Sequence, residues 1–189
     1  TYYNMTCNGD NTVFVNGTTT VNNTLTIDGT TTVDVTGGTD LNGTGSLVMN
    51  GASLLRISSA GTVPALTGAS NALAAGTTIE LYRAGAQTAA SSASFPYQNV
   101  IISGNAGSAV NLNAVSGIAG DLTVTNAGSF NNAASTPPLI TVAGDFNYGS
   151  TATTTLNTSL TAASVSISGT GGFTYSNQTI TLSQNDAFW

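Results

Sequence analysis

The chain contains no lysine and no histidine, and its 189 residues include only two cationic side chains, Arg56 and Arg83. Charged residues make up 5% of the sequence, against roughly a quarter in a typical soluble domain. The formal net charge is −6. Because affinity for DNA and RNA comes mainly from Lys and Arg that neutralise phosphates, nucleic acid is excluded as a partner. Catalysis by histidine or lysine is excluded as well.

Cysteine and long apolar runs are also scarce. Cys7 is the only cysteine, so no intrachain disulfide can form, and we expect a buried thiol there. With one Cys and no His, the sequence offers no zinc, haem or iron–sulfur site. No apolar run approaches the 18 or more residues that cross a bilayer, so no membrane span is expected. The sequence begins at Thr1 without a basic leader, which indicates a processed chain or a fragment.

Four small or polar residue types dominate what is present. The sequence has 33 Thr, 20 Ser, 20 Asn and 22 Gly, together about half of the chain. Disordered chains combine low hydrophobicity with high net charge and few β-branched residues. Here 40% of residues are hydrophobic, the mean hydropathy is +0.16, and β-branched residues are abundant. The composition therefore predicts a folded chain.

Apolar residues recur in pairs at positions i and i+2, bounded by Gly, Asn, Asp or Ser. This period of two is typical of half-buried β-strands, and no stretch shows a convincing helical period. Ser70 to Ala75 is the best helical candidate, but it is short and is predicted to be a loop or cap. The pairs are Val13/Val15, Leu25/Ile27, Val33/Val35, Leu47/Met49, Leu55/Ile57, Ile79/Leu81, Val100/Ile102, Val110/Leu112, Leu122/Val124, Ile140/Val142, Phe146/Tyr148, Val165/Ile167, Phe173/Tyr175 and Ile180/Leu182.

Two all-β architectures accommodate many short strands. The favoured one is a parallel β-helix (β-solenoid), in which alternate residues fill a narrow core and Gly or Asn turns the corners. The alternative is an antiparallel β-sandwich, supported by Asn-Gly pairs typical of hairpins at Asn8, Asn16, Asn42 and Asn50. We expect an N-terminal β-rich capping region over 1–60 and a solenoid body over 61–189, with one continuous domain over 1–189 as the alternative.

Part of the chain resembles a known family. The segments GTTIELYRAGAQTAASSASFPYQNVIISG from Gly76, GIAGDLTVTNAGSFNNA from Gly117 and LITVAGDFNYGS from Leu139 carry the resemblance. They are similar to coils of the filamentous-haemagglutinin-like β-helical surface adhesins and fibre repeats of Bacteroidota and similar bacteria. The resemblance covers about half the chain, from Gly76 to Gly171. It implies a solenoid fold and a location outside the cell or on its surface.

The acidic residues do not form a recognisable active site. Asp28, Asp34 and Asp40 recur every six residues, but each lies beside a turn residue and is expected to bond its own backbone. A "GGTD" fragment at Gly37 weakly suggests calcium held by Asp34 and Asp40, yet the motif does not recur. We therefore predict no catalytic residue, no metal and no cofactor. Arg83 lies three residues after Glu80, and we expect an ion pair between them.

Six Asn residues lie two positions before Ser or Thr and are candidate N-glycosylation sites. Their number is close to the chance expectation for this composition. They are Asn4, Asn16, Asn22, Asn42, Asn157 and Asn177.

The function expected from these features is that of a non-enzymatic, extracellular or cell-surface structural protein. A solenoid ends in unpaired strands, and charges and Pro, which normally block such edges, are scarce here. Terminal strands are therefore predicted to join copies head to tail, with the chain itself as partner and surface glycans as a further one. The alternative is a carbohydrate-binding or polysaccharide-processing β-helix protein. The predicted self-assembly interface consists of Tyr2, Tyr3, Ile180, Leu182, Phe188 and Trp189.

Overall fold

Parallel strands stacked in successive turns make up the structure. It is a computed structural model that describes residues 1–104, 109–112, 114–125, 129–130, 139–151, 153–156, 158–175 and 178–183. Within these ranges every strand pair is parallel and no helix is present, so the predicted β-solenoid is confirmed and the antiparallel sandwich is wrong. Three of the Asn-Gly pairs lie between strands, where Gly9 and Gly51 adopt φ values of 101° and 67° that other residues rarely reach, whereas Asn42 and Gly43 lie in a strand.

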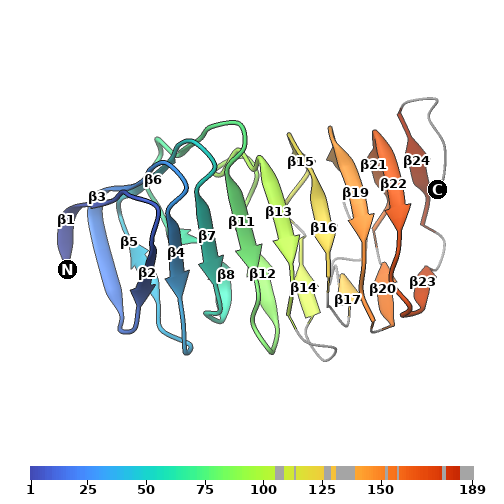
Figure 1. Cartoon of the computed structure of the whole chain (residues 1–189), viewed down its shortest axis with the longest axis horizontal. Coiled ribbons are helices and arrows are strands. Elements are labelled where there is room, and N and C mark those ends of the chain that lie inside the picture. Colours follow the sequence, from blue (N-terminus) through green and yellow to red (C-terminus); the bar gives the residue numbers. More distant parts are fainter. Residues whose placement is uncertain are drawn as a thin grey trace.

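One long sheet runs along the whole solenoid (Figure 1). It has eight strands, one from each turn, so seven full turns separate the first from the last. The sheet continues across position 60, because β7 pairs with β11. In spatial order its strands are β2 (Thr12–Val15), β4 (Thr32–Val35), β7 (Leu54–Ile57), β11 (Thr78–Leu81), β13 (Asn99–Ile102), β16 (Leu122–Val124), β19 (Asp145–Tyr148) and β22 (Ser164–Ile167).

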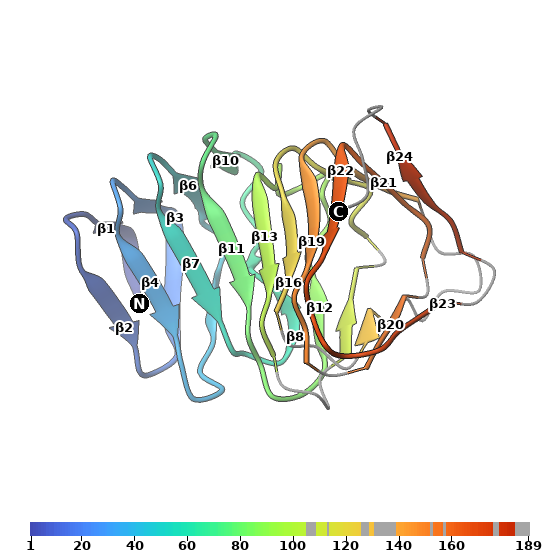
Figure 2. The same ribbon diagram turned by 45° about the vertical axis from the view of Figure 1, so that its right-hand side comes forward.

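The other faces of the solenoid are formed by one six-stranded sheet in the first half and by a six-stranded and a four-stranded sheet in the second (Figure 2). In the first half, β3 (Thr19–Ile27) bends so that its start pairs with β5 (Leu41–Gly43) and its end with β6 (Ser46–Met49). The same sheet contains β1 (Tyr2–Cys7), β9 (Ala65–Leu66) and β10 (Ala72–Leu73). In the second half one face carries β8 (Gly61–Val63), β12 (Gln87–Ala89), β14 (Ala109–Asn111), β17 (Ser129–Phe130), β20 (Thr154–Leu156) and β23 (Phe173–Tyr175), and the other carries β15 (Gly117–Ile118), β18 (Ile140–Val142), β21 (Leu160–Ala162) and β24 (Ile180–Leu182).

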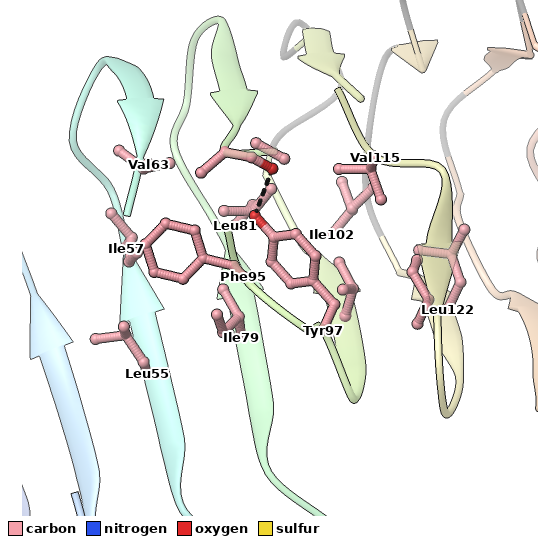
Figure 3. Close-up of a cluster of buried hydrophobic side chains, with 14 of the residues drawn as sticks. Leu55, Ile57, Val63, Ile79, Leu81, Phe95, Tyr97, Ile102, Val115 and Leu122 are labelled. Atoms are coloured by element: carbon pink, nitrogen blue, oxygen red, sulfur yellow. Dashed lines mark hydrogen bonds between the residues drawn. The ribbon is translucent and has the colours of Figure 1, made fainter. Parts of the chain in front are cut away.

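Inward side chains stack in columns that form a continuous apolar core. One column of the long sheet runs from Val13 through Leu55 and Ile79 to Val165, and neighbours in the columns are 19 to 24 residues apart. The third face carries β10 in the first half of the solenoid and β15 in the second. Between these two strands Phe95 and Tyr97 fill the core instead of a strand, with their ring centroids 6.4 Å apart (Figure 3). Burial of these columns is the main stabilising contribution expected for such a narrow fold.

The segment from Ser70 to Ala75 differs from its prediction. It contains the two-residue strand β10, which pairs with β6, and Leu73 is buried in the core. A strand of two residues is too short to show an alternation of apolar and polar side chains. The prediction of a loop or cap was therefore wrong for Ala72 and Leu73, which form a strand because they pair with the neighbouring turn.

A ladder of short polar side chains holds one corner of the solenoid. The backbone N–H of Asp121 donates to Asn99 Oδ1 at 3.0 Å, and that of Asp145 donates to Asp121 Oδ1 at 2.8 Å. The Ser164 hydroxyl then donates to Asp145 Oδ1 at 2.7 Å. The "GD" steps of the sequence are therefore corner residues, in which each Asp receives a bond from the next turn.

Candidate functional site: the two ends of the solenoid

Side chains of the core columns become exposed at the N-terminal end. Tyr2 pairs in register with Val21, which is fully buried, yet Tyr2 is 52% exposed. Met5 aligns with the buried Leu25 but is itself only partly buried, and Val13 of the first long-sheet strand is also half-buried. These residues point along the same columns as the core, so their exposure results from the absence of a further turn above them in the structure.

The C-terminal end shows the same arrangement. Ile167 aligns with Tyr148, which is 1% exposed, but Ile167 itself is 47% exposed. On the third face, Ile180 and Leu182 align with the buried Leu160 and Ala162 and are half-buried. β1 and β2 lie at one end of the solenoid and β22 and β24 at the other (Figure 1). Both ends therefore present apolar side chains in the pattern that one turn presents to the next.

The end strands also carry unpaired backbone groups. Among the described residues, β2 pairs only with β4 and β22 only with β19, so within this part of the chain one edge of each strand has no partner. Natural proteins protect such edges with Lys, Pro, inward charges or covering elements. The end strands contain no Lys, no Pro and no charged residue; their sequences are YYNMTC, TVFV, SVSI and ITL. The described end strands therefore lack, in their own sequences, the residues that usually protect such edges.

The four described end strands carry no charged side chain. Both arginines lie in the middle turns, and Asp10, at the N-terminal corner, accepts a 2.6 Å hydrogen bond from the Thr30 hydroxyl. Cys7 is buried, as predicted, and burial raises the pKa of its thiol. Across the described residues, apolar contact and backbone hydrogen bonding are therefore the interactions that the ends can offer.

The predicted assembly residues fall into three groups. Tyr2 and Tyr3 lie exposed on β1, and Ile180 and Leu182 lie on the last strand of the third face. Phe188 and Trp189 lie outside the described residues. Sequence reasoning missed Ile167, although a repeat of 19 residues from Tyr148 would have aligned it with the core.

A charged cluster occupies the outer face of the long sheet, at the middle of its N-terminal half. Arg56 lies in register between Asp34 and Glu80. Its Nη1 donates to Asp34 Oδ2 at 3.0 Å and its Nε donates to Glu80 Oε2 at 2.6 Å. The Tyr82 hydroxyl donates to Asp34 Oδ1 at 2.5 Å, and the Arg56 guanidinium carbon lies 4.6 Å from the Tyr82 ring centroid. The Ser103 hydroxyl donates to Glu80 Oε1.

This cluster corrects two sequence predictions. Glu80 pairs with Arg56 and not with Arg83, because Arg56 is its register partner on β7 whereas Arg83 lies beyond the end of β11. Asp34 is in mid-strand and bonds Arg56 and Tyr82 rather than its own backbone. The hydrogen bond that Arg56 donates to Glu80 raises the pKa of Arg56, and burial together with the bond to Asp34 raises the pKa of Tyr82. The arrangement locks three adjacent turns together.

The other acidic candidates lie apart from this cluster. Asp28 accepts a 2.6 Å hydrogen bond from Asn50 Nδ2 at a corner, and the carbonyl of Asp40 accepts one from the Thr19 N–H at 2.8 Å. Both carboxylate oxygens of Asp34 are already hydrogen-bonded. Over the ranges that the structure covers, no three acidic or sulfur side chains gather in a way that could hold a metal ion.

The candidate glycosylation sites that can be placed lie near the N-terminal end. Asn4, Asn16 and Asn22 are exposed, whereas Asn42 is half-buried and accepts a 3.0 Å hydrogen bond from the Thr20 hydroxyl. Asn157 and Asn177 lie outside the described residues.

Two further findings complete the description of the chain. Its described part has no helix of the length and hydrophobicity that crossing a membrane requires. Comparisons with protein-family models, curated proteins and solved structures found no match.

Proposed function

We propose that the chain is a non-enzymatic, extracellular structural protein whose copies associate end to end through their terminal turns. The observation that carries this proposal is the exposure of core-column side chains at both ends, Tyr2 and Met5 at one and Ile167 at the other. An added turn would bury them. Fully burying one large apolar side chain stabilises a contact by about 1.5–3 kcal/mol.

The geometry of the contact follows from the columns. If β22 of one copy lies beside β2 of the next, both edges gain parallel hydrogen bonds and Ile167 continues the column of Val15. The contact joins two different ends, so it is heterologous and repeats into a filament unless its rotation closes a ring. Location outside the cell rests on the composition and on the adhesin-like repeats of the sequence.

A non-enzymatic role is supported by the state of the best-placed carboxylates. Asp34 and Glu80 both face Arg56, and their remaining oxygens accept bonds from Tyr82 and Ser103. General acid–base hydrolysis needs two carboxylates free to flank a bond and exchange protons. These two carboxylates instead serve as the fixed acceptors of an ion-pair network.

The test uses variants that each place a charge at one end. Ile167→Glu should block the C-terminal end and Tyr2→Glu the N-terminal end, and each should sediment as a monomer under conditions in which the unmodified chain forms fibres. Leu139→Glu is the matched control, because Leu139 is 51% exposed but precedes a strand in the body of the solenoid. It should form fibres like the unmodified chain.

Mixing the two blocked variants makes the test specific for a head-to-tail contact. Each retains one competent end, so the mixture should form dimers and nothing longer in sedimentation velocity. Negative-stain images should show fibres only for the unmodified chain and the Leu139 variant. A monomeric unmodified chain, or fibres that persist in both end variants, would overturn the proposal.

A further inference from the structure

A groove at one corner of the solenoid contains the second arginine of the chain. It has a volume of about 460 Å³ and is lined by Gly37, Gly38, Ser58, Arg83, Ala84 and Gly85. Sites for small ligands typically have volumes of roughly 300–1,000 Å³ and a few well-placed polar groups. The lining contains one positive charge, no acidic residue and no large apolar side chain.

Arg83 has no carboxylate partner among the described residues. The two ion pairs found there both belong to Arg56, which holds the nearest acid in sequence, Glu80. Arg83 Nη1 donates to the Ser58 carbonyl at 3.1 Å, and this bond fixes one side of the guanidinium. The guanidinium has five N–H donors in all, so donors remain for a ligand.

The backbone of the corner that carries Arg83 is fixed by hydrogen bonds to a buried side chain, that of Gln87. Gln87 is 2% exposed and its Oε1 accepts a 3.1 Å hydrogen bond from the Arg83 N–H. Gln87 Nε2 donates to the carbonyls of Ile57 and Ser59, both at 2.9 Å. A buried amide therefore ties the Arg83 backbone to the preceding turn, which positions the side chain before any ligand binds.

Glycines keep the approach to the guanidinium open. Gly37 and Gly38 adopt φ values of 65° and 73°, which favour glycine, and a Cβ on either would meet nothing within 4 Å. A Cβ on Gly85 would lie 3.2 Å from Arg83 Nε. Any larger residue at position 85 would thus cover part of the charged group.

We propose that this groove binds the carboxylate of an acidic sugar, such as a hexuronate unit of a polysaccharide. The planar guanidinium matches the two oxygens of a carboxylate. The lining has glycine peptide groups and no large apolar side chain, so it suits sugar hydroxyls better than an apolar ligand. A singly charged carboxylate is also repelled less by the net charge of −6 than a phosphate would be. The site is distinct from the terminal turns and does not depend on assembly.

The experiment compares galacturonate with galactose, which lacks the carboxylate. Amide resonances of Gly37, Gly38, Ala84 and Gly85 are followed by NMR during titration of the end-blocked Ile167→Glu chain, or of the unmodified chain if that proves monomeric. Galacturonate should give saturable shifts at these residues. Galactose should bind at least about tenfold more weakly, since a hydrogen-bonded charge pair is lost.

Two variants and one control locate the site. Arg83→Gln and Gly85→Val should each weaken galacturonate binding by about tenfold or more, the first by removing the charge and the second by covering it. Gly17→Val is the control, because a Cβ on Gly17 meets nothing within 4 Å and Gly17 lies at another corner. It should bind like the parent, and circular dichroism should show that all three remain folded.

Three results would overturn the inference. The first is the absence of saturable shifts with galacturonate, and the second is equal binding by the Arg83→Gln variant. The third is inorganic phosphate that binds as tightly as galacturonate, which would show a general anion site instead of a sugar site. None of these results bears on end-to-end assembly, which is measured separately by sedimentation.

Discussion

Arg56 is the residue on which most electrostatic stabilisation of this nearly uncharged molecule depends. Asp34 is 5% exposed and Glu80 is 9% exposed, so both carboxylates are largely removed from water. A buried charge left without its partner is strongly destabilising, whereas an exposed ion pair contributes little. Arg56 itself remains 34% exposed, so solvent screens part of the interaction.

Replacement of Arg56 should therefore destabilise the fold more than replacement of Arg83. We expect Arg56→Gln to lower the free energy of unfolding by about 1–3 kcal/mol, because Asp34 and Glu80 lose their shared cation. Arg83→Gln removes the same charge and should change the free energy by about 0.5 kcal/mol. Urea unfolding followed by circular dichroism measures both. Equal losses would show that net charge matters and that the buried pairs do not.

Tyr97 should make the fold sensitive to alkaline pH. Burial raises its pKa well above the ordinary value of 10.0, and its hydroxyl donates to the Ala90 carbonyl at 3.0 Å (Figure 3). The folded state thus keeps a proton that the unfolded state releases above about pH 10. Above that pH the unfolded state binds fewer protons than the folded state. The contribution of Tyr97 to the free energy of unfolding is therefore complete below about pH 10 and falls as the pH rises further.

The check is a comparison with Tyr97→Phe. The variant should lose about 1 kcal/mol at neutral pH through the missing hydrogen bond. Above about pH 10 its unfolding free energy should fall less steeply than that of the parent. Residual alkaline sensitivity is expected from Tyr82, whose pKa is also raised. Parallel slopes in the two proteins would contradict the assignment to Tyr97.

At the scale of elements, strand positions were readily predicted and their pairing was not. Each apolar pair read from the sequence overlaps a strand, because one strand face packs into a narrow core. The strands that contain no predicted pair are mostly short: β9, β15 and β17 have two residues each, and β5, β8, β12, β20 and β21 have three. Their position is fixed by neighbouring turns, and this non-local information is absent from local alternation.

The charged cluster around Arg56 was harder to predict than the fold, because it too depends on contacts between turns. Arg56 and Glu80 are 24 residues apart, and only the length of each turn brings them together. Turn length varies between 19 and 24 residues, so no fixed repeat reveals the register. Once the columns are known, they also identify the core-column side chains that are exposed at the ends; Ile167, for example, continues the column of Tyr148.

The corner ladder leads to a prediction about Gly144. A Cβ at this position would overlap Asp121 Oδ1 and would lie 2.9 Å from the carbonyl group of Gly120. Gly144→Ala should therefore lower the free energy of unfolding by about 1–3 kcal/mol, the usual range for overpacking. The added methyl group would meet backbone atoms of Gly120 and the carboxylate of Asp121, which is itself hydrogen-bonded, so neither neighbour can move freely.

Gly117→Ala is the matched control for that substitution. A Cβ on Gly117 meets nothing within 4 Å, and its φ is not in the left-handed region. This variant should be neutral or slightly stabilising, because Ala restricts the unfolded chain. Thermal unfolding of both variants gives the comparison. If Gly144→Ala is as stable as Gly117→Ala, the corner is looser than the ladder of hydrogen bonds indicates.

At the scale of the whole molecule, each turn pairs with its two neighbours, and the hydrogen bond from Tyr82 to Asp34 reaches across one intervening turn, so stability should be close to a sum over turns. Removal of Thr32 to Ser53 tests this property. Thr32 and Leu54 are register partners 22 residues apart, so the shortened chain brings Leu54 into the place of Thr32 beside Thr12. Arg56 then keeps Glu80 and loses Asp34. We expect a folded β-protein whose denaturant m value falls roughly in proportion to the 22 of 189 residues removed.

A deletion that removes only part of a turn provides the control. Loss of Thr32 to Asn42 takes away β4 and most of β5 but leaves β6, so one turn lacks two of its three faces. The residues before the junction then have no complete turn to pack against, and their amides should lose protection in hydrogen exchange while the later turns keep it. The whole-turn deletion should retain protection on both sides of its junction. If both deletions unfold the entire chain, stability is cooperative over the full length, and the description of the solenoid as a stack of separable turns is wrong.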